Sequence, residues 1–180
     1  MWRPAPHQNS LLSFLLRTSC GAQACVSYTR TVQITLAHVG PQPSAADDYE
    51  RLTQMYVQRC AGFSRCEAKA FRTEQALLDG IAKLQGRTAP VTVLLDARGR
   101  SMTSEAFAAW LGARRDDGAQ HVVFAIGPAS GWSEAARGSA RLLLSLGQFT
   151  LAHPLARLVM AEQIYRATTI LTGHPYHTGH

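Results

Sequence analysis

The side chains best suited to chemistry gather in the last third of the chain. His153 stands before a proline, Arg166 follows on the same predicted helix, and Tyr176 and His177 lie close to the end. A histidine can take up a proton near neutral pH. An arginine can contact a phosphate or stabilise an anion that develops on a base. These four residues are therefore the candidates for catalysis, although His153 could equally cap the start of the helix.

A metal site is the competing interpretation of the tail. Three histidines lie close together there, namely His174, His177 and His180. Pro175 and Gly179 interrupt any helix through this stretch, so the spacing does not place the three imidazoles on one face. The four cysteines, Cys20, Cys25, Cys60 and Cys66, form no C-x2-C pair. We therefore expect no metal, and we expect Cys60 and Cys66 to be reduced, part-buried thiols.

Three segments lie at the carboxyl ends of predicted strands and could bind a ligand: residues 94–96, 126–131 and 146–151. Ligands of open α/β sheets bind outside the carboxyl ends of the strands. Gly127 and Gly131 permit tight turns and a close approach of the backbone, but they form neither a dinucleotide fingerprint nor a phosphate loop. They could be simple turn glycines. Asp96 could contact a ligand or cap the next turn.

The elements that must position these residues alternate between strand and helix. Apolar or alternating patterns predict strands at 32–39, 67–71, 91–96, 121–126 and 141–145. Helices are predicted over 47–61, with Gly62 as the stop, after the cap Thr73, with Gly86 as the stop, from Thr103 or Ser104, and after the cap Ser133. This order indicates an α/β fold with a mainly parallel, Rossmann-like sheet. Ordinary topology rules predict that such a sheet is unknotted.

The last predicted helix, from Pro154 to Gly173, carries an apolar surface wider than one stripe. Its apolar residues are Leu155, Leu158, Val159, Ile164, Tyr165, Ile170 and Leu171. Proline suits the first helical turn and glycine the left-handed residue after the last. A surface this wide suggests burial on two sides, for which a second copy of the chain is the simplest cover.

Composition sets mild limits. A chain of 180 residues favours one domain, and no apolar run approaches the ~18–20 residues that cross a bilayer. The net charge of +6 is compatible with RNA but is no evidence for it. Residues 1–31 contain Leu11–Leu16, a short apolar run that resembles a signal peptide. That run is shorter than such signals need.

The carboxy-terminal motifs resemble those of a known family. His153-Pro154-Leu155-x-Arg157, Ala161-Glu162-Gln163-x-Tyr165-Arg166-Ala167 and His174-Pro175-Tyr176-His177 are similar to the end of the RlmH family. Its members are small SPOUT-class methyltransferases that act on a pseudouridine of large-subunit ribosomal RNA. The resemblance covers residues 32–180 as a single domain and is densest from Asp96 onward. Because members of the family begin close to Val32, the resemblance implies that residues 1–31 are a disordered or loosely attached extension, or a start site assigned too early.

The resemblance implies a fold, a cofactor and partners. It implies a carboxy-terminal trefoil knot, a cytoplasmic homodimer, and N3-methylation of a pseudouridine in 23S rRNA of the assembled ribosome, with S-adenosylmethionine as donor. The residues that it places around the cofactor are Leu95, Gly127, Leu146, Gly147, Gln148, Phe149, Thr150 and Leu151. It also implies that the tail crosses the dimer interface and closes over the partner's pocket, where Tyr176 could stack on RNA.

Two departures from the family pattern keep other functions open. Pro128 stands where the family usually has a second glycine, and Thr178 stands where members commonly have a basic residue. Both would suit a non-catalytic module that binds RNA or the ribosome. A related knotted enzyme acting on transfer RNA is a further alternative.

Overall fold

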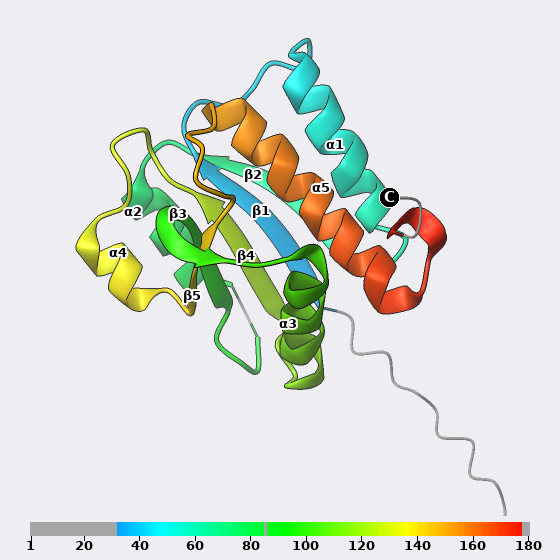
Figure 1. The fold of residues 1–180 in the computed structure, drawn as a ribbon. Coiled ribbons are helices and arrows are strands. Elements are labelled where there is room, and N and C mark those ends of the chain that lie inside the picture. Colours follow the sequence, from blue (N-terminus) through cyan, green and yellow to red (C-terminus); the bar gives the residue numbers. More distant parts are fainter. Residues whose placement is uncertain (1–31, 85, 178–180) are drawn as a thin grey trace, which may run out of the picture.

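A computed structural model of the chain describes residues 32–84 and 86–177 (Figure 1). The predicted N-terminal extension and the weighed signal peptide fall within residues 1–31, outside the described residues. Thr178, Gly179 and His180 at the end of the tail lie outside them as well. Within the described ranges, none of the helices has the length and apolar character needed to span a membrane.

The core of the fold is a five-stranded sheet in which each paired strand runs parallel to its neighbour. Its strands are β1 (Gln33–Val39), β2 (Arg65–Phe71), β3 (Val91–Ser101), β4 (His121–Ile126) and β5 (Leu142–Ser145). They lie in the order β2-β1-β4-β3-β5. The central strands are almost fully apolar because helices cover both faces of the sheet. The predicted mainly parallel α/β architecture is confirmed.

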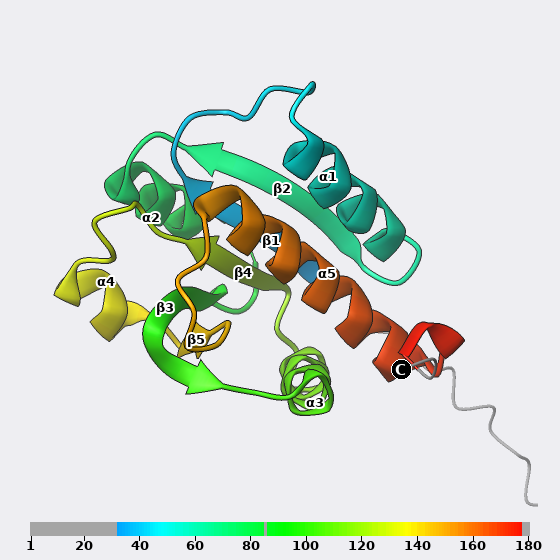
Figure 2. The same ribbon diagram turned by 45° about the horizontal axis from the view of Figure 1, so that its top comes forward.

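The helices form two layers of unequal size (Figures 1 and 2). On one face lie α1 (Asp48–Cys60), α3 (Ser104–Asp116) and α5 (His153–Thr172), and on the other lie α2 (Glu74–Ala82) and α4 (Glu134–Ser139). A short 3₁₀ helix, η1 (Pro175–His177), follows α5 and packs against it. The larger layer therefore contains both the predicted catalytic helix and the tail.

Helix α5 lies between α1 and α3 above the sheet (Figure 2). Met160, Ala161, Ile164 and Tyr165 are buried in the main core. The apolar surface of α5 is thus buried on two sides, as predicted, but by helices of the same chain: α1 packs on one side and α3 on the other. The width of the apolar surface therefore does not by itself require a second copy.

The helix starts follow the predicted capping, whereas one of the predicted stops is wrong. Thr73, Thr103 and Ser133 each accept a hydrogen bond from a backbone N–H of the first turn. Gly62 directly follows Ala61, the C-cap of α1, so it stands at the predicted end of that helix. The prediction that Gly86 ends α2 is wrong, because α2 stops at Ala82 and its C-cap is the right-handed residue Lys83. Gly173, with φ +69°, ends α5 as predicted.

Strand β3 does not end at Asp96, which corrects the prediction. It continues to Ser101, and its pairing with β5 is irregular between Leu95 and Arg100. Figure 2 shows the strand curving at this point. Asp96 Oδ1 accepts a hydrogen bond of 2.8 Å from the N–H of Arg98, so the side chain supports the bend, as the turn interpretation proposed. The bend wraps the end of β3 around β5.

The bend requires a glycine at position 99. A Cβ added at Gly99 would lie 2.7 Å from backbone atoms of Leu143 and Leu144, which cannot yield as a flexible side chain can. We expect Gly99→Ala to lower the free energy of unfolding by about 1–3 kcal/mol, measured by urea denaturation. Gly138→Ala is the matched control, because a Cβ there meets nothing within 4 Å. Equal stability of the two variants would contradict the close approach.

Candidate active site

A hollow opens where β5 leaves the sheet. It has a volume of about 200 Å³ and is lined by Ser101, Met102, Phe107, Leu144, Ser145, Leu146, Gly147, Met160 and Gln163. The bent end of β3, helix α3, strand β5 and helix α5 each contribute side chains. Most of the lining is apolar, and the Gln163 amide is the largest polar group in it. Such a lining suits a flat, largely apolar ring with a few hydrogen-bonding edges.

The loop between β5 and α5 forms one rim of the hollow. Leu146 and Gly147 line it, whereas Gln148, Phe149 and Thr150 are exposed and Leu151 is half-buried. Gly147 has φ +120°, a conformation that favours glycine. The Ser145 hydroxyl holds this turn, donating to the Gly147 carbonyl at 3.0 Å and lying 3.2 Å from its N–H. Phe149 is 90% exposed, so this loop presents a large apolar side chain to solvent.

The two remaining predicted cofactor residues form a second group, beyond the lining of the hollow. Leu95 pairs with Ile126 across β3 and β4, and Gly127 follows directly. Both contact Trp132: its indole N–H donates to the Leu95 carbonyl at 2.9 Å, and its ring lies against Gly127. Sequence reasoning missed Trp132. A tryptophan among small and polar residues after Gly131 was the available signal.

His153 belongs to this second group and does not cap α5. The N-cap is Ala152, which makes no side-chain capping bond, so the capping interpretation is wrong. The His153 Nε2 instead lies 3.2 Å from the carbonyl oxygen of Gly127. Its ring also meets the ring of His38 edge-on at 5.6 Å between centroids. Beneath the two rings, Arg157 forms a buried ion pair with Glu50 at 3.0 Å.

The two histidines give the fold a dependence on pH. Burial lowers the pKa of His38 and of His153 below the ordinary 6.5, and the positive charge of Arg157 lowers both further. Below 6.5 the unfolded chain therefore binds protons that the folded chain still refuses, so stability falls as the pH drops through this window. We expect urea denaturation between about pH 8 and pH 5 to show this loss. A double variant, His38→Gln with His153→Gln, should show a smaller slope; an unchanged slope would contradict the assignment.

Arg166 and Tyr176 lie together, on α5 and η1. The Arg166 guanidinium donates to Glu162 Oε1 through Nε at 3.0 Å and Nη2 at 2.6 Å, and it sits 5.0 Å from the centre of the Tyr176 ring. The Tyr176 hydroxyl donates to the same carboxylate oxygen at 3.1 Å. Sequence reasoning did not identify Glu162 as a partner of these two residues. This acidic side chain holds the arginine in place and neutralises part of its charge.

The protonation of these groups limits their chemistry. Burial and the hydrogen bond with Tyr56 raise the pKa of Tyr176, so its phenol stays protonated at neutral pH and is poorly suited to act as a base. The hydrogen bond with Glu162 raises the pKa of Arg166, which stays charged. His177 Nε2 lies 3.1 Å from Glu105 Oε1 on α3. The described part of the tail therefore packs on the chain's own helices.

Gln163 connects the hollow to the arginine. Its amide donates to Glu162 Oε2 at 2.6 Å and accepts from the Ser104 hydroxyl at 2.8 Å. The hollow and the Arg166–Tyr176 pair are therefore neighbours along α5. His153 stands elsewhere, beside Gly127, so the four predicted catalytic residues do not form one cluster.

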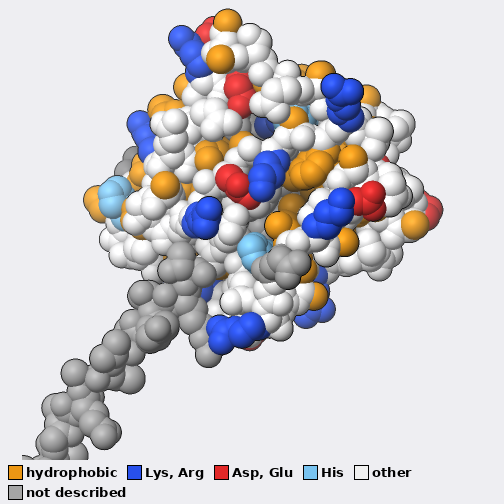
Figure 3. Space-filling view, turned by 180° about the vertical axis from the view of Figure 1, so that it is seen from behind, with side chains coloured by type: hydrophobic (Ala, Val, Ile, Leu, Met, Phe, Trp, Pro, Cys, Tyr) orange, Lys and Arg blue, Asp and Glu red, His pale blue; other side chains and the backbone are white. Residues whose placement is uncertain are grey.

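On the face opposite to the larger helix layer, the described residues form no basic stripe. Lys and Arg side chains are scattered over this face, and Asp, Glu and exposed apolar side chains lie between them (Figure 3). Across residues 32–84 and 86–177, no three histidine, cysteine, aspartate or glutamate side chains gather as a metal site would require. Cys60 is buried and Cys66 half-buried, and both are free thiols, as predicted.

Comparison with known proteins identifies the family. A family described as predicted SPOUT methyltransferase matches residues 32–177. The chain is also 48% identical over 131 residues to the ribosomal RNA large subunit methyltransferase H of Koribacter versatilis, over 73% of this chain and 89% of that relative. The chain belongs to the RlmH family of SPOUT methyltransferases. The Brucella ovis protein of the same name is 53% identical over 85 residues, covering 47% of this chain and 50% of that relative.

One solved structure is similar at a much lower level. The SpoU methyltransferase AviRb from Streptomyces viridochromogenes, in complex with AdoMet, aligns with a TM-score of 0.44 and 12% identity. The alignment covers 76% of this chain and 58% of that one. A likeness this low carries no argument about the site. The RlmH assignment rests on sequence similarity: the carboxy-terminal motifs indicated the family, and the family model and the curated relatives match it.

In this RlmH-family chain, the predicted residues occupy three neighbouring places. Leu146 and Gly147 line the hollow. Leu95 and Gly127 lie where β3 bends and β4 ends, and His153 contacts Gly127 there. Arg166, Tyr176 and His177 lie where α5 meets the tail and α3. The loop 146–152 joins the first place to the second, and Gln163 joins the first to the third.

Proposed function

We propose that the chain transfers the methyl group of S-adenosylmethionine to N3 of a pseudouridine in 23S rRNA of the assembled ribosome. The observation that carries the proposal is the hollow beside Gly147, separated from the charged Arg166 only by the Gln163–Glu162 contact. Relatives of the chain are named ribosomal RNA large subunit methyltransferases. Pseudouridine, N3 and the ribosome are expectations that come from the family resemblance.

The residues present fit an adenosine-containing cofactor. The lining of Phe107, Leu144, Leu146 and Met160 is apolar, and a Cβ at Gly147 would meet no atom within 4 Å, so the turn leaves open space. Backbone groups of 146–151, with Leu95 and Gly127, would contact the adenine and the ribose. The cofactor supplies an activated methyl group, so the protein need only align the acceptor and exclude water. Such positioning can contribute about 7–11 kcal/mol.

The acceptor nitrogen must lose a proton, and in this proposal the charged Arg166 stabilises the anion that remains. His153 and His177 are the two candidate bases. The lowered pKa of His153, caused by burial, keeps its ring neutral and able to take a proton. The protonated phenol of Tyr176 is better suited to stacking on a base than to accepting a proton.

We further propose a knotted homodimer that works in the cytoplasm. The bent end of β3 crosses the backbone of β5 at Gly99, and the chain then returns through 146–152 to α5, a path compatible with a trefoil knot. Tyr49 and Leu52 on α1 are 46% and 42% exposed, beside α5, where a second copy could pack. In that assembly the tail would close over the partner's pocket.

Analysis of RNA from a deletion strain tests the substrate. Mass spectrometry of 23S rRNA should show a pseudouridine that lacks its N3-methyl group, restored by a plasmid copy. Purified protein should methylate whole ribosomes and not naked 23S rRNA. Loss of a methyl group from transfer RNA instead would establish the related knotted enzyme and overturn the ribosomal assignment.

Calorimetry separates an enzyme from a non-catalytic binding module. Pro128, which departs from the family pattern, begins a turn closed by the Gly131 N–H donating to its carbonyl at 2.9 Å, so this turn does not need the missing amide. We therefore expect S-adenosylhomocysteine, the demethylated product, to bind. No heat with either form of the cofactor would favour the module.

Gly147→Val should abolish cofactor binding. The residue has φ +120°, which a β-branched side chain does not adopt, and the new methyl groups would point into open space at the rim of the hollow. We expect S-adenosylhomocysteine affinity to fall at least about 100-fold by calorimetry, with the fold retained in circular dichroism. Gly138→Val, on the exposed helix α4, is the control. Unchanged affinity in Gly147→Val would remove this loop from the site.

A further inference from the structure

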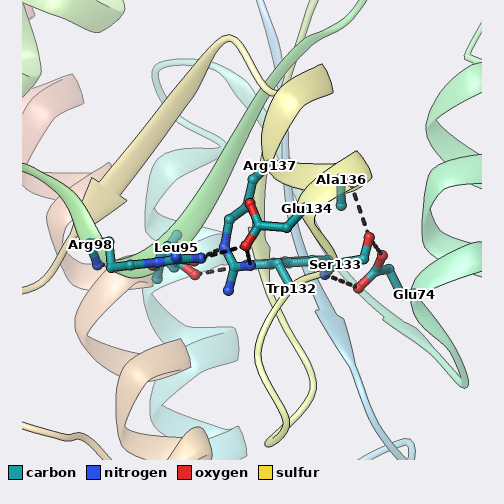
Figure 4. A network of polar contacts seen from close by, with 9 residues as sticks. Glu74, Leu95, Arg98, Trp132, Ser133, Glu134, Ala136 and Arg137 are labelled. Carbon is teal, nitrogen blue, oxygen red and sulfur yellow. Dashed lines mark hydrogen bonds and ion pairs between the residues drawn. The ribbon is translucent and has the colours of Figure 1, made fainter.

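Trp132 is a buried aromatic residue in the turn that joins β4 to α4. Only 4% of it is exposed, and it contacts two backbone segments of the proposed cofactor site. Figure 4 shows its indole reaching across to β3, where the N–H donates to the Leu95 carbonyl at 2.9 Å. A Cβ at Gly127 would lie 2.8 Å from the ring, so the ring is in close contact with that glycine. One side chain thus connects the bend of β3 with the end of the adjacent strand β4.

Polar contacts on both sides hold the turn that carries the ring (Figure 4). On one side, the Ser133 N–H donates to Glu74 Oε2 at 3.1 Å, and its hydroxyl donates to Oε1. On the other, Arg137 Nε donates to Asp96 Oδ2 at 2.7 Å. These anchors leave the indole little freedom to move. The ring is therefore held against Leu95 and Gly127.

We propose that Trp132 is a positioning residue for the cofactor, which acts by fixing Leu95 and Gly127 at the spacing that the adenosine needs. The inference rests on the proposed function and assigns the requirement for glycine at position 127 to the tryptophan ring. A carbonyl held by the indole keeps one orientation, so the backbone beside it is preorganised for a ligand. Gly127 is then a glycine because the ring occupies the space of its side chain.

A purely structural role would look different. Leu77 of α2 belongs to the same hydrophobic cluster and is completely buried, and its apolar side chain can donate no hydrogen bond to a strand end. Shortening Leu77 should therefore lower stability without changing the site. Shortening Trp132 should change both, and this difference separates positioning from packing.

The first test compares Trp132→Phe with Leu77→Val by calorimetry, using S-adenosylhomocysteine as the probe. We expect Trp132→Phe to weaken binding about tenfold, because the donor to Leu95 is lost, while its turnover at saturating S-adenosylmethionine stays within about twofold of wild type. Leu77→Val should lower the melting temperature and leave affinity unchanged. Wild-type affinity in Trp132→Phe, or an equal loss in Leu77→Val, would overturn the inference.

The second test uses the contact between the ring and position 127, and remains informative if one variant is unstable. Gly127→Ala alone should bind the probe at least about tenfold more weakly, because the new methyl group displaces the ring. In the double variant, Gly127→Ala with Trp132→Leu, the smaller side chain removes the clash between the new methyl group and the ring. Its loss of affinity should therefore be smaller than the sum of the losses in the two single variants. Strictly additive losses would overturn the coupling.

Failure of the inference and of the proposed function are distinguishable. If wild-type protein binds neither S-adenosylhomocysteine nor S-adenosylmethionine, the proposed function is overturned and the inference with it. If wild-type protein binds and the Trp132 variants bind equally well, the inference alone is overturned.

Discussion

Arg166→Ala is expected to reduce methyl transfer to ribosomes by about 100-fold to 1000-fold, the usual effect of removing one group that stabilises a developing anion. Cofactor affinity should stay near that of wild type, because Gln163 and not Arg166 lines the hollow. The guanidinium is charged, held by Glu162, and lies beside the Tyr176 ring, where a substrate base could stack. Single-turnover methylation and calorimetry with S-adenosylhomocysteine measure the two quantities separately.

Two further variants complete this experiment. Arg166→Lys keeps the charge but loses the two-point contact with Glu162, so we expect an intermediate rate. Arg115→Ala removes an arginine from the exposed end of α3, where it pairs with Asp116, and should leave the rate unchanged. Equal losses of turnover and cofactor affinity in Arg166→Ala would contradict the assigned role.

Arg157→Ala is expected to lower the free energy of unfolding by about 3–5 kcal/mol, because it leaves a buried carboxylate without its partner. Arg157 and Glu50 have side chains that are only 5% and 10% exposed, and the pair joins α5 to α1. Burial is the largest cause that lowers the pKa of His38 and His153, and the charge of Arg157 lowers both further. Removal of Arg157 should raise both pKa values toward the unfolded value, so stability should fall less between about pH 8 and pH 5. Urea denaturation across pH measures both effects.

The control for this prediction is an exposed ion pair of the same type. Arg51 pairs with Asp48 at 2.8 Å, with side chains 68% and 79% exposed, so Arg51→Ala should cost about 0–1 kcal/mol. Replacing both buried partners, Arg157→Met with Glu50→Leu, should restore much of the stability lost in Arg157→Ala. If Arg157→Ala and Arg51→Ala proved equally stable, burial would not be the source of the effect.

Local patterns predicted the elements of the fold well. Thr73, Thr103 and Ser133 cap helices as their side chains allow, and Gly173 ends α5 in the left-handed conformation. These features depend on hydrogen bonds within one turn of the chain, so neighbouring residues are enough to specify them. The strand bounds failed at Asp96, because the bend of β3 depends on the backbone of β5, far along the chain.

The candidate site was only partly predictable. The motifs around His153, Arg166 and Tyr176 identified the family from sequence alone, and the comparisons confirmed it. They did not indicate that Glu162 would hold Arg166, nor that His153 would face Gly127 and not cap its helix. The type of a residue limits the reactions that it can take part in, but the residues that it contacts depend on how the helices pack.

The amino-acid sequence by itself determined the order of strands and helices, the parallel α/β class and the RlmH family. Periodicity, capping residues and uncommon motifs each depend on residues that are close together in the sequence. The tertiary structure alone decided the bend of β3, the buried Arg157–Glu50 pair and the position of Trp132 between Leu95 and Gly127. Each of these joins segments distant in sequence. Such contacts exist only once the sheet and its helix layers have packed.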